Sequence, residues 1–239
     1  NAEQRFIIAE QLKELNVSPK AIILEPITKN TAPATALACI LLSKNSPDPL
    51  ILVLPSDHVI SDSKAFQCAI EKAAKVALDG YIVTFGIKPT RIETGYGYIK
   101  TGKPLSAHKG FFKISKFIEK PDVVGAKRYI SKGNYSWNSG MFIFKASVFL
   151  NELKRLEPEI ADSCRRSIST AKVDLDFIRI GEASFKTCPP NSIDKAVMEN
   201  TTKGVVGPVQ LGWSDVGAWD SLWEISQKVL GVLFLDTPQ

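Results

Sequence analysis

Two aspartates far apart in the sequence each follow an apolar stretch and have the chemistry to bind a divalent cation. Asp57 lies in Leu-Pro-Ser-Asp-His (54–58), directly after the apolar run 50–54, and Asp215 lies in Gly-Trp-Ser-Asp-Val-Gly (212–217). The apolar run predicts a strand buried on both faces of a parallel sheet. Because open α/β sheets bind ligands at the carboxyl ends of their strands, we expect both aspartates to hold Mg²⁺ against nucleotide phosphates. Taken singly, either aspartate could instead cap a helix or close a turn.

A second set of residues has the chemistry to bind a phosphorylated sugar. Glu119 and Lys120 stand together in Phe-Ile-Glu-Lys-Pro (117–121) at the end of a predicted strand. The carboxylate can accept hydrogen bonds from sugar hydroxyls, and the ammonium can meet a phosphate. The alternative is an exposed ion pair of little consequence. Gly97 lies in Glu-Thr-Gly-Tyr-Gly-Tyr (93–98), where glycines let a ligand approach the backbone, although a plain hairpin would use the same glycines.

Three further segments place polar side chains at junctions between predicted elements. Asn138 precedes an apolar strand in Trp-Asn-Ser-Gly-Met (137–141), and Glu199 lies in Ser-Ile-Asp-Lys-Ala-Val-Met-Glu (192–199), which opens a predicted helix with Ser192 as its cap. Both could point at a polyol. The segment Asn-Thr-Ala-Pro-Ala (30–34) begins a helix, and capping alone would explain its first residues. An asparagine at a helix start is also suited to reading a nucleobase edge.

The order of elements predicts an α/β fold. Apolar patterns indicate strands at 21–24, 50–54 and 81–85, with helices at 32–43 and 63–78 between them. This rhythm is typical of βαβ units in a doubly wound parallel sheet. Later strands are expected at 96–101, 111–117 and 141–144, helices at 3–15, 123–131 and 147–156, and a solvated helical layer over 158–179.

Composition indicates a soluble globular protein rather than a membrane or nucleic-acid-binding one. The 239 residues are 44% hydrophobic and 23% charged, and the net charge of +5 is spread along the chain without a basic block. No apolar run approaches the roughly 20 residues that span a bilayer, and no signal peptide is apparent, so we expect a cytoplasmic protein. Four cysteines without metal spacing predict reduced thiols, with Cys39 and Cys68 on apolar helix faces.

Read in order, these motifs resemble the mannose-1-phosphate guanylyltransferases, a branch of the sugar-nucleotide pyrophosphorylases. The resemblance covers nearly the whole chain. Glu-Lys-Pro and the aspartate positions are shared by the wider family, whereas Asn-Thr-Ala-Pro-Ala and Trp-Ser-Asp-Val-Gly resemble the mannose and guanine branch. The resemblance implies a Rossmann-like, glycosyltransferase A-like nucleotidyltransferase fold. Its sheet is expected to be mixed but mainly parallel, flanked by helices, with a smaller β-containing sugar-binding region.

The resemblance also implies a reaction in which GTP and α-D-mannose 1-phosphate give GDP-mannose and pyrophosphate, with Mg²⁺ as cofactor. The roles that it implies follow the motifs. Asp57 and Asp215 hold the ion, Lys120 meets the sugar phosphate, mannose lies against Gly97, Glu119, Asn138 and Glu199, and guanine faces Asn30, Thr31, Ala32 and Pro33. Two alternatives stay open: a pyrophosphorylase for another base or sugar, and a non-catalytic regulatory homologue that binds GDP-mannose. A homo-oligomer is compatible with either.

The chain departs from the family pattern at its start. The family opens with a strand and a Gly-rich, Arg-bearing loop that cradles the triphosphate, and this sequence resembles it only downstream of that loop. We therefore expect residues to be missing before Asn1, because loss of the strand would expose sheet edges and apolar surface. A chain that truly began at Asn1 is expected to fold poorly and turn over negligibly. Residues 1–226 are assigned to the nucleotidyltransferase domain, and 227–239 to the start of a C-terminal extension or linker.

Overall fold

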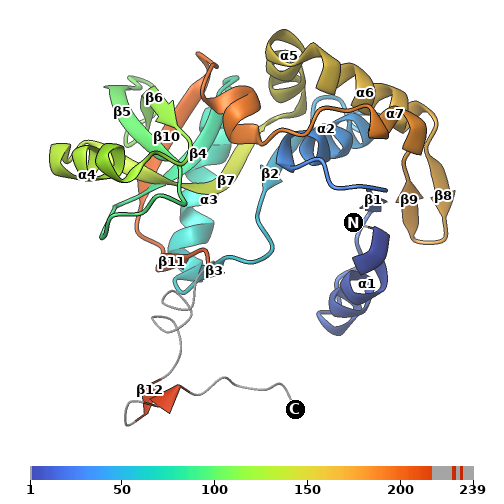
Figure 1. Cartoon of the computed structure of the whole chain (residues 1–239), viewed down its shortest axis with the longest axis horizontal. Coiled ribbons are helices and arrows are strands. Elements are labelled where there is room, and N and C mark those ends of the chain that lie inside the picture. The colour runs from blue at the N-terminus through green and yellow to red at the C-terminus, as the bar shows by residue number, and fades with distance from the viewer. Residues whose placement is uncertain (1, 217–227, 230–231, 234–239) are drawn as a thin grey trace.

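The computed structural model describes residues 2–216, 228–229 and 232–233, and its α/β architecture confirms the predicted fold class (Figure 1). Most elements begin and end within two residues of the predicted bounds, but β7 begins at Tyr135 where a strand was predicted only over 141–144, and β5 ends at Pro104 where the prediction ended at 101. The helices are η1 (Ala2–Gln4), α1 (Arg5–Glu14), α2 (Thr31–Leu42), α3 (Ser63–Leu78), α4 (Val123–Lys132), α5 (Ala146–Leu156), α6 (Pro158–Ser169), α7 (Glu182–Lys186) and the π-helical turn η2 (Asp194–Met198). The strands are β1 (Ile22–Leu24), β2 (Leu50–Val53), β3 (Val59–Ile60), β4 (Ile82–Ile87), β5 (Tyr98–Pro104), β6 (Phe112–Ile118), β7 (Tyr135–Lys145), β8 (Lys172–Asp174), β9 (Phe177–Arg179), β10 (Gly204–Val209), β11 (Trp213–Ser214), β12 (Lys228–Val229) and β13 (Val232–Leu233).

A six-stranded sheet in the order β2-β7-β4-β10-β6-β5 forms the centre of the fold. The expectation of a mainly parallel sheet is wrong, because β4 and β10 are the one parallel pair in it among the described residues. The reason is β7, which runs antiparallel between β2 and β4 and also pairs with β5. The strands β2 and β4 do share a direction, as a βαβ unit requires, but they are not neighbours.

Helices cover both faces of this sheet. On one face α3 packs on β4, β7 and β10, with Val76, Phe85 and Ile143 among its buried contacts. On the other face, α2, α5 and α6 pack together around Phe144 and Phe149, whose stacked rings lie 4.8 Å apart. Figure 1 shows these helices gathered with α7 on one side of the molecule, while α4 lies by β5 and β7 on the opposite side. The sheet therefore packs between two layers of helices through apolar side chains.

The strand β2 lies at the edge of the sheet, so the prediction of burial on both faces is wrong for it. Ile51 is buried, whereas Leu50 and Leu52 are each 37% exposed and Leu54 is 47% exposed. In the described residues β2 pairs with β7 alone. Successive side chains of a strand point to opposite faces, so Ile51 faces the core while Leu50, Leu52 and Leu54 lie on a face that is left partly uncovered.

A second, three-stranded sheet in the order β1-β9-β8 lies beside α1 (Figure 1). The helical layer expected over 158–179 is confirmed only for its first half, where α6 forms; β8 and β9 replace it from residue 172. Leu175 takes a φ of 56° at the turn between these strands, a conformation that no helix contains. The helix has already ended at Ser169, and the chain at Leu175 has a turn conformation.

The four cysteines differ in their exposure. All four cysteines are free, and Cys39 is buried as predicted, but Cys68 is exposed on α3. Among the described residues, no helix is both long and apolar enough to cross a bilayer. Gly217 and most of the proposed C-terminal extension lie outside the described residues.

Candidate nucleotide-sugar site

The close approach of Gly97 to β7 brings the predicted sugar-binding residues together. The backbone N–H of Asn138 donates to the carbonyl of Gly97 over 2.8 Å. A Cβ added to Gly97 would lie 2.8 Å from Oε2 of Glu119 and 3.3 Å from Cβ of Asn138. Real Cβ atoms do not approach that closely, so a side chain at this position would displace the carboxylate of Glu119 from its place beside Gly97. The structure thus brings Gly97, Glu119 and Asn138 to one place.

Three carboxylates surround this point. Oε1 of Glu199 accepts from the backbone N–H of Glu119 over 3.1 Å, and Oδ1 of Asp194 accepts from Nδ2 of Asn138 over 2.8 Å. Burial, followed by the charge of Asp194, raises the pKa of Glu119 to about 7 against the opposing effect of the Lys120 ammonium. Burial likewise raises the pKa of Asp194. The cluster can accept several hydrogen bonds from a polyol, and Glu119 exchanges its proton near neutral pH.

Lys120 carries the one cation in direct contact with the carboxyl of Glu119 in the described structure. Its Nζ lies 3.6 Å from Oε1 of Glu119, and its side chain is 64% exposed. The residue has a φ of 48°, a strained left-handed conformation for a side chain other than glycine. Pro121 follows at once and restricts the backbone further. An exposed ammonium beside a half-buried carboxylate is suited to a phosphate carried by a polyol.

The two aspartates approach each other through a short antiparallel pair. β3 pairs with β11 so that Ser214 lies opposite Val59, which brings the chain at Asp215 beside His58, next to Asp57. The charges of both aspartates act on the pKa of His58, although burial dominates and lowers it. Nδ1 of His58 accepts from the indole N–H of Trp213 over 3.2 Å, so the imidazole is neutral there, with its proton on Nε2. These contacts indicate that His58 has a structural role beside the aspartates.

Tyr96 fixes the second aspartate. Its hydroxyl donates to Oδ1 of Asp215 over 2.6 Å, and its ring packs edge-on against Trp137 and Trp213. Burial and the charge of Asp215 raise the pKa of the Tyr96 hydroxyl, which stays protonated as a donor. We call the group of Gly97, Glu119, Asn138, Asp194 and Glu199 the sugar-side cluster. Tyr96 directly precedes Gly97, and Trp137 directly precedes Asn138. The segments 96–97 and 137–138 therefore connect the aspartates to the sugar-side cluster.

Two carboxylates suit a Mg²⁺ ion that takes its other ligands from phosphates and water. Oδ1 of Asp215 is engaged by Tyr96, which leaves its second oxygen, and Asp57 is exposed. Within the described ranges no group of three or more His, Cys, Asp or Glu side chains is arranged to hold a metal. The donor set fits an ion held together with a substrate better than an ion held by protein alone.

The start of α2 is tied to the sugar-side cluster by the segment before η2. Asn30 has a φ of 71°, and its Oδ1 accepts from the backbone N–H of Thr31 over 2.8 Å. The Thr31 hydroxyl accepts from the backbone N–H of Ile193 over 3.0 Å. Ala32 and Pro33 are buried, so they present no side-chain surface to a ligand. Of the four residues predicted to face a base, Asn30 alone combines an exposed position with an amide.

Sequence reasoning missed three residues that the structure brings into these clusters, and a fourth, Glu25, that lies outside them. Asp194 and Tyr96 lie inside the motifs described above, but nothing in their spacing singled them out. Glu25 carries a buried Oε1 without a hydrogen-bond partner, and burial raises the pKa of its carboxyl. Thr84 gave no signal, because a threonine in an apolar strand is ordinary. Its hydroxyl donates to Oδ1 of Asn138 over 2.8 Å.

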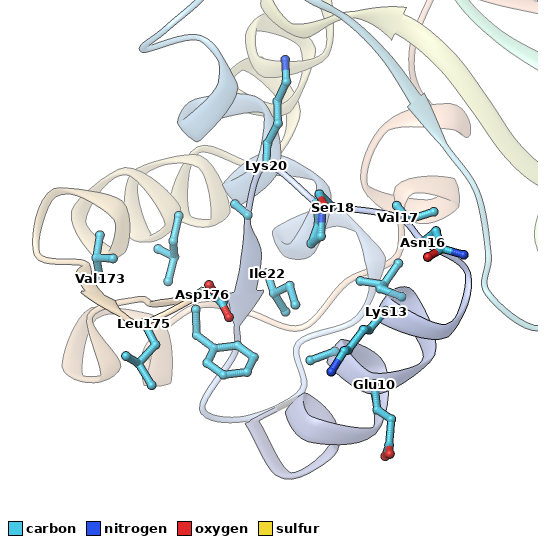
Figure 2. Close-up of a pocket in the computed structure, with 16 residues that line it drawn as sticks. Glu10, Lys13, Asn16, Val17, Ser18, Lys20, Ile22, Val173, Leu175 and Asp176 are labelled. Atoms are coloured by element: carbon cyan, nitrogen blue, oxygen red, sulfur yellow. The ribbon is translucent and has the colours of Figure 1, made fainter.

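A hollow lined by described residues lies away from these clusters. Figure 2 shows it between α1, the segment 16–22 and the β8–β9 hairpin, with a volume of about 990 Å³. Glu10, Lys13, Lys20 and Asp176 are the charged groups around it. None of the predicted site residues lines this hollow. The predicted sugar-binding residues lie instead where the start of β5, the end of β6 and the middle of β7 meet.

Comparison with known proteins identifies the family of this chain. The sequence model of the family described as Nucleotidyl transferase matches residues 1–231. Similar curated proteins include the xanthan biosynthesis protein XanB of Xanthomonas campestris, at 51% identity over 95% of this chain and 48% of that protein. The mannose-1-phosphate guanylyltransferase RfbM of Salmonella typhimurium is likewise 51% identical, and that of Escherichia coli K12 is 50% identical, each over 95% of this chain and 48% of the relative. The chain spans about half the length of these relatives.

Solved structures with a similar fold include proteins described as acting on mannose phosphates. A structure described as mannose-6-phosphate isomerase from Helicobacter pylori has a TM-score of 0.81 at 34% identity, covering 90% of this chain and 83% of that one. One described as mannose-1-phosphate geranyltransferase from Thermus thermophilus has a TM-score of 0.74 at 32% identity, covering 86% and 58%. A UDP-glucose pyrophosphorylase shares the fold at 13% identity, with a TM-score of 0.51 over 82% of this chain and 60% of that one. With a family match over nearly its whole length and relatives half identical to it, this chain belongs to the nucleotidyl transferase family.

Proposed function

We propose that the protein forms GDP-mannose and pyrophosphate from GTP and α-D-mannose 1-phosphate. The observation that carries the proposal is the junction at Gly97 and Asn138, which sets a carboxylate cluster with one exposed lysine beside the aspartate pair. A sugar phosphate needs the carboxylate cluster and the lysine. A nucleotide triphosphate with its cation needs the aspartate pair. The similarity to guanylyltransferases supports mannose and guanine as the sugar and the base.

In this reaction an oxygen of the sugar phosphate attacks the α-phosphorus of GTP in line. The new phosphorus–oxygen bond forms as the bond to the β-phosphate oxygen breaks, and pyrophosphate leaves with that electron pair. No proton has to be removed from the attacking phosphate oxygen when it is ionised. The protein therefore needs no nucleophile or general base of its own, and positioning and charge carry the catalysis.

The residues divide this work. Lys120 binds the phosphate of the sugar, while Glu119, Asn138 and Glu199 accept or donate hydrogen bonds to its hydroxyls. Gly97 keeps the floor of this cluster free of a side chain. Asp57 and Asp215 hold Mg²⁺, which neutralises charge on the phosphates when bound.

The base is read at the start of α2. The exposed amide of Asn30 lies on the connection between β1 and α2, where its donor and acceptor can pair with the edge of a base. Asn30→Gly removes the amide and tolerates the positive φ of this position. This variant is therefore expected to reduce the preference for GTP, measured as the ratio of kcat/KM for GTP to that for ATP.

The proposal is tested by Mg²⁺-dependent pyrophosphate release from mannose 1-phosphate with GTP, compared with ATP, UTP, CTP and dTTP. We expect release that is selective for GTP and is lost in Lys120→Met. Lys116→Met removes an exposed lysine four residues earlier on β6 and serves as the matched control. Selectivity for another nucleotide would replace the proposed substrate. Binding of GDP-mannose without any release would identify a regulatory binding protein instead.

A further inference from the structure

A buried hydrogen-bond chain crosses the sugar-side cluster and ends on the side chain of Asn138. The Asn138 residue is 8% exposed. Its Oδ1 accepts from the hydroxyl of Thr84 and its Nδ2 donates to Oδ1 of Asp194, both over 2.8 Å. One end of this chain is in the centre of the sheet, and the other is at the first residue of the turn η2.

Thr84 cannot contact a substrate, because its residue is 0% exposed in β4. It reaches Asn138 through a bulge in the β4–β7 pairing. From the pair Gly86 and Asn138 to the pair Thr84 and Phe142, β4 covers two residues (86 − 84) while β7 covers four (142 − 138). The extra residues let one hydroxyl lie 2.8 Å from the Asn138 amide oxygen and 2.9 Å from the carbonyl of Met141. Bulges of this kind often re-aim a side chain beside a functional site.

The two partners together decide which way the amide faces. Oδ1 of Asp194 accepts a hydrogen bond from Nδ2, which places the amide nitrogen on the side of η2. The amide oxygen then points at Thr84, whose single hydroxyl proton is shared between that oxygen, at 2.8 Å, and the carbonyl of Met141, at 2.9 Å. Without these partners, the two orientations of an asparagine amide differ little in energy and both would be populated. With them, one N–H and one lone pair of Asn138 remain for a ligand, in fixed directions.

We propose that Thr84 and Asp194 are positioning residues that hold the Asn138 amide in a single orientation for recognition of the sugar hydroxyls of mannose 1-phosphate. The inference rests on the proposed function for its substrate, but the orientation itself is a property of the free protein. Both groups act through Asn138 and not by contact with the reacting atoms. The turn η2 supports the assignment, since single π-helical turns are frequent at functional sites.

The first test is Thr84→Val, which keeps the shape of the side chain and removes the hydroxyl. We expect KM for mannose 1-phosphate to rise about fivefold to tenfold, the size of one lost hydrogen bond, while KM for GTP stays within twofold. Thr84→Ser restores the hydroxyl and should restore KM. Ser167→Ala removes another fully buried hydroxyl, on α6, and should change neither constant. Asp194→Asn should raise the same KM, and combining it with Thr84→Val should add little, because both act on one amide.

The second test follows the amide directly, without substrate. In wild-type protein the side-chain NH₂ resonances of Asn138, assigned by their loss in Asn138→Asp, should exchange slowly with water, and exchange should accelerate in Thr84→Val. Unchanged exchange in Thr84→Val would overturn the inference, as would an equal rise in KM for both substrates. A wild-type protein with a protected amide that fails to bind mannose 1-phosphate would refute the proposed function and leave the positioning of the amide supported.

Discussion

The replacement Gly97→Ala tests whether the close meeting of three segments is needed for sugar-phosphate binding. The new Cβ would lie 2.8 Å from Oε2 of Glu119, whereas ordinary contacts begin at 3.4 Å, so about 0.6 Å (3.4 − 2.8) must be recovered by movement. The side chain of Glu119 can rotate, but Cβ of Asn138 and Cε1 of Phe117, each 3.3 Å away, close the other directions. The carboxylate is therefore expected to leave its position.

The size of the effect follows from that displacement. A shift of 1 Å in a positioning group can cost about 100-fold in rate, so we expect kcat/KM for mannose 1-phosphate to fall about 10- to 100-fold. Overpacking should also lower the free energy of unfolding by roughly 1 to 3 kcal/mol. The KM for GTP should change much less, because the aspartate pair is held by other contacts.

The matched control is Gly95→Ala, two residues earlier in the same motif. A Cβ there would contact only Oε1 of Glu93, at 3.4 Å, and the backbone φ is not positive. Steady-state pyrophosphate release and thermal unfolding would be measured for both variants. A Gly97→Ala protein within twofold of wild type, or a Gly95→Ala protein equally impaired, would refute the argument from close approach.

Three further predictions concern the metal side, the pH dependence and the core. Asp215→Asn should abolish Mg²⁺-dependent pyrophosphate release with little change in the melting temperature, because an asparagine still accepts from Tyr96; wild-type turnover would remove Asp215 from the metal site. The pKa of Glu119 is raised from 4.5 to about 7, so the folded protein keeps a proton that the unfolded chain releases, and stability should fall as the pH rises from about 4.5 to 7. Glu119→Gln should remove this decline, seen as a flatter dependence of the melting temperature on pH; an unchanged dependence would show that the carboxyl is not protonated there. Phe149→Ala should lower the free energy of unfolding in urea by roughly 3 to 5 kcal/mol, since it leaves a cavity against Phe144, and a loss below 1 kcal/mol would contradict the packing.

Local sequence predicted most elements well because their signals are local. The helix at 63–78 has its apolar positions on one face and a cap at Asp62, whose Oδ1 accepts from the backbone N–H of Ala65 as such caps do. The α/β class followed from the alternation of such helices with apolar strands. Predictions that required knowledge of neighbours failed, as for β2, whose apolar run is the same whether the strand lies in the centre or at the edge of a sheet.

In the candidate site, likewise, the residue types were predictable from the sequence and their placement was not. Asn138, Glu119, Lys120, Asp57 and Asp215 were recognisable from residue types in ordered motifs, and the chemistry that each can perform is fixed by its side chain. Their mutual placement was not, because it depends on the direction of β7, on its bulge and on the pairing of β3 with β11.

The sequence by itself determined the class of fold, the family and the groups available for chemistry, because these depend on composition, periodicity and motif order. Only the tertiary structure decided that Asp194 and Thr84 hold Asn138, that burial moves the pKa of Glu119 toward neutrality, and that Ala32 and Pro33 are enclosed. Burial and hydrogen bonding between residues tens of positions apart are properties of packing, and no local pattern in the chain encodes them.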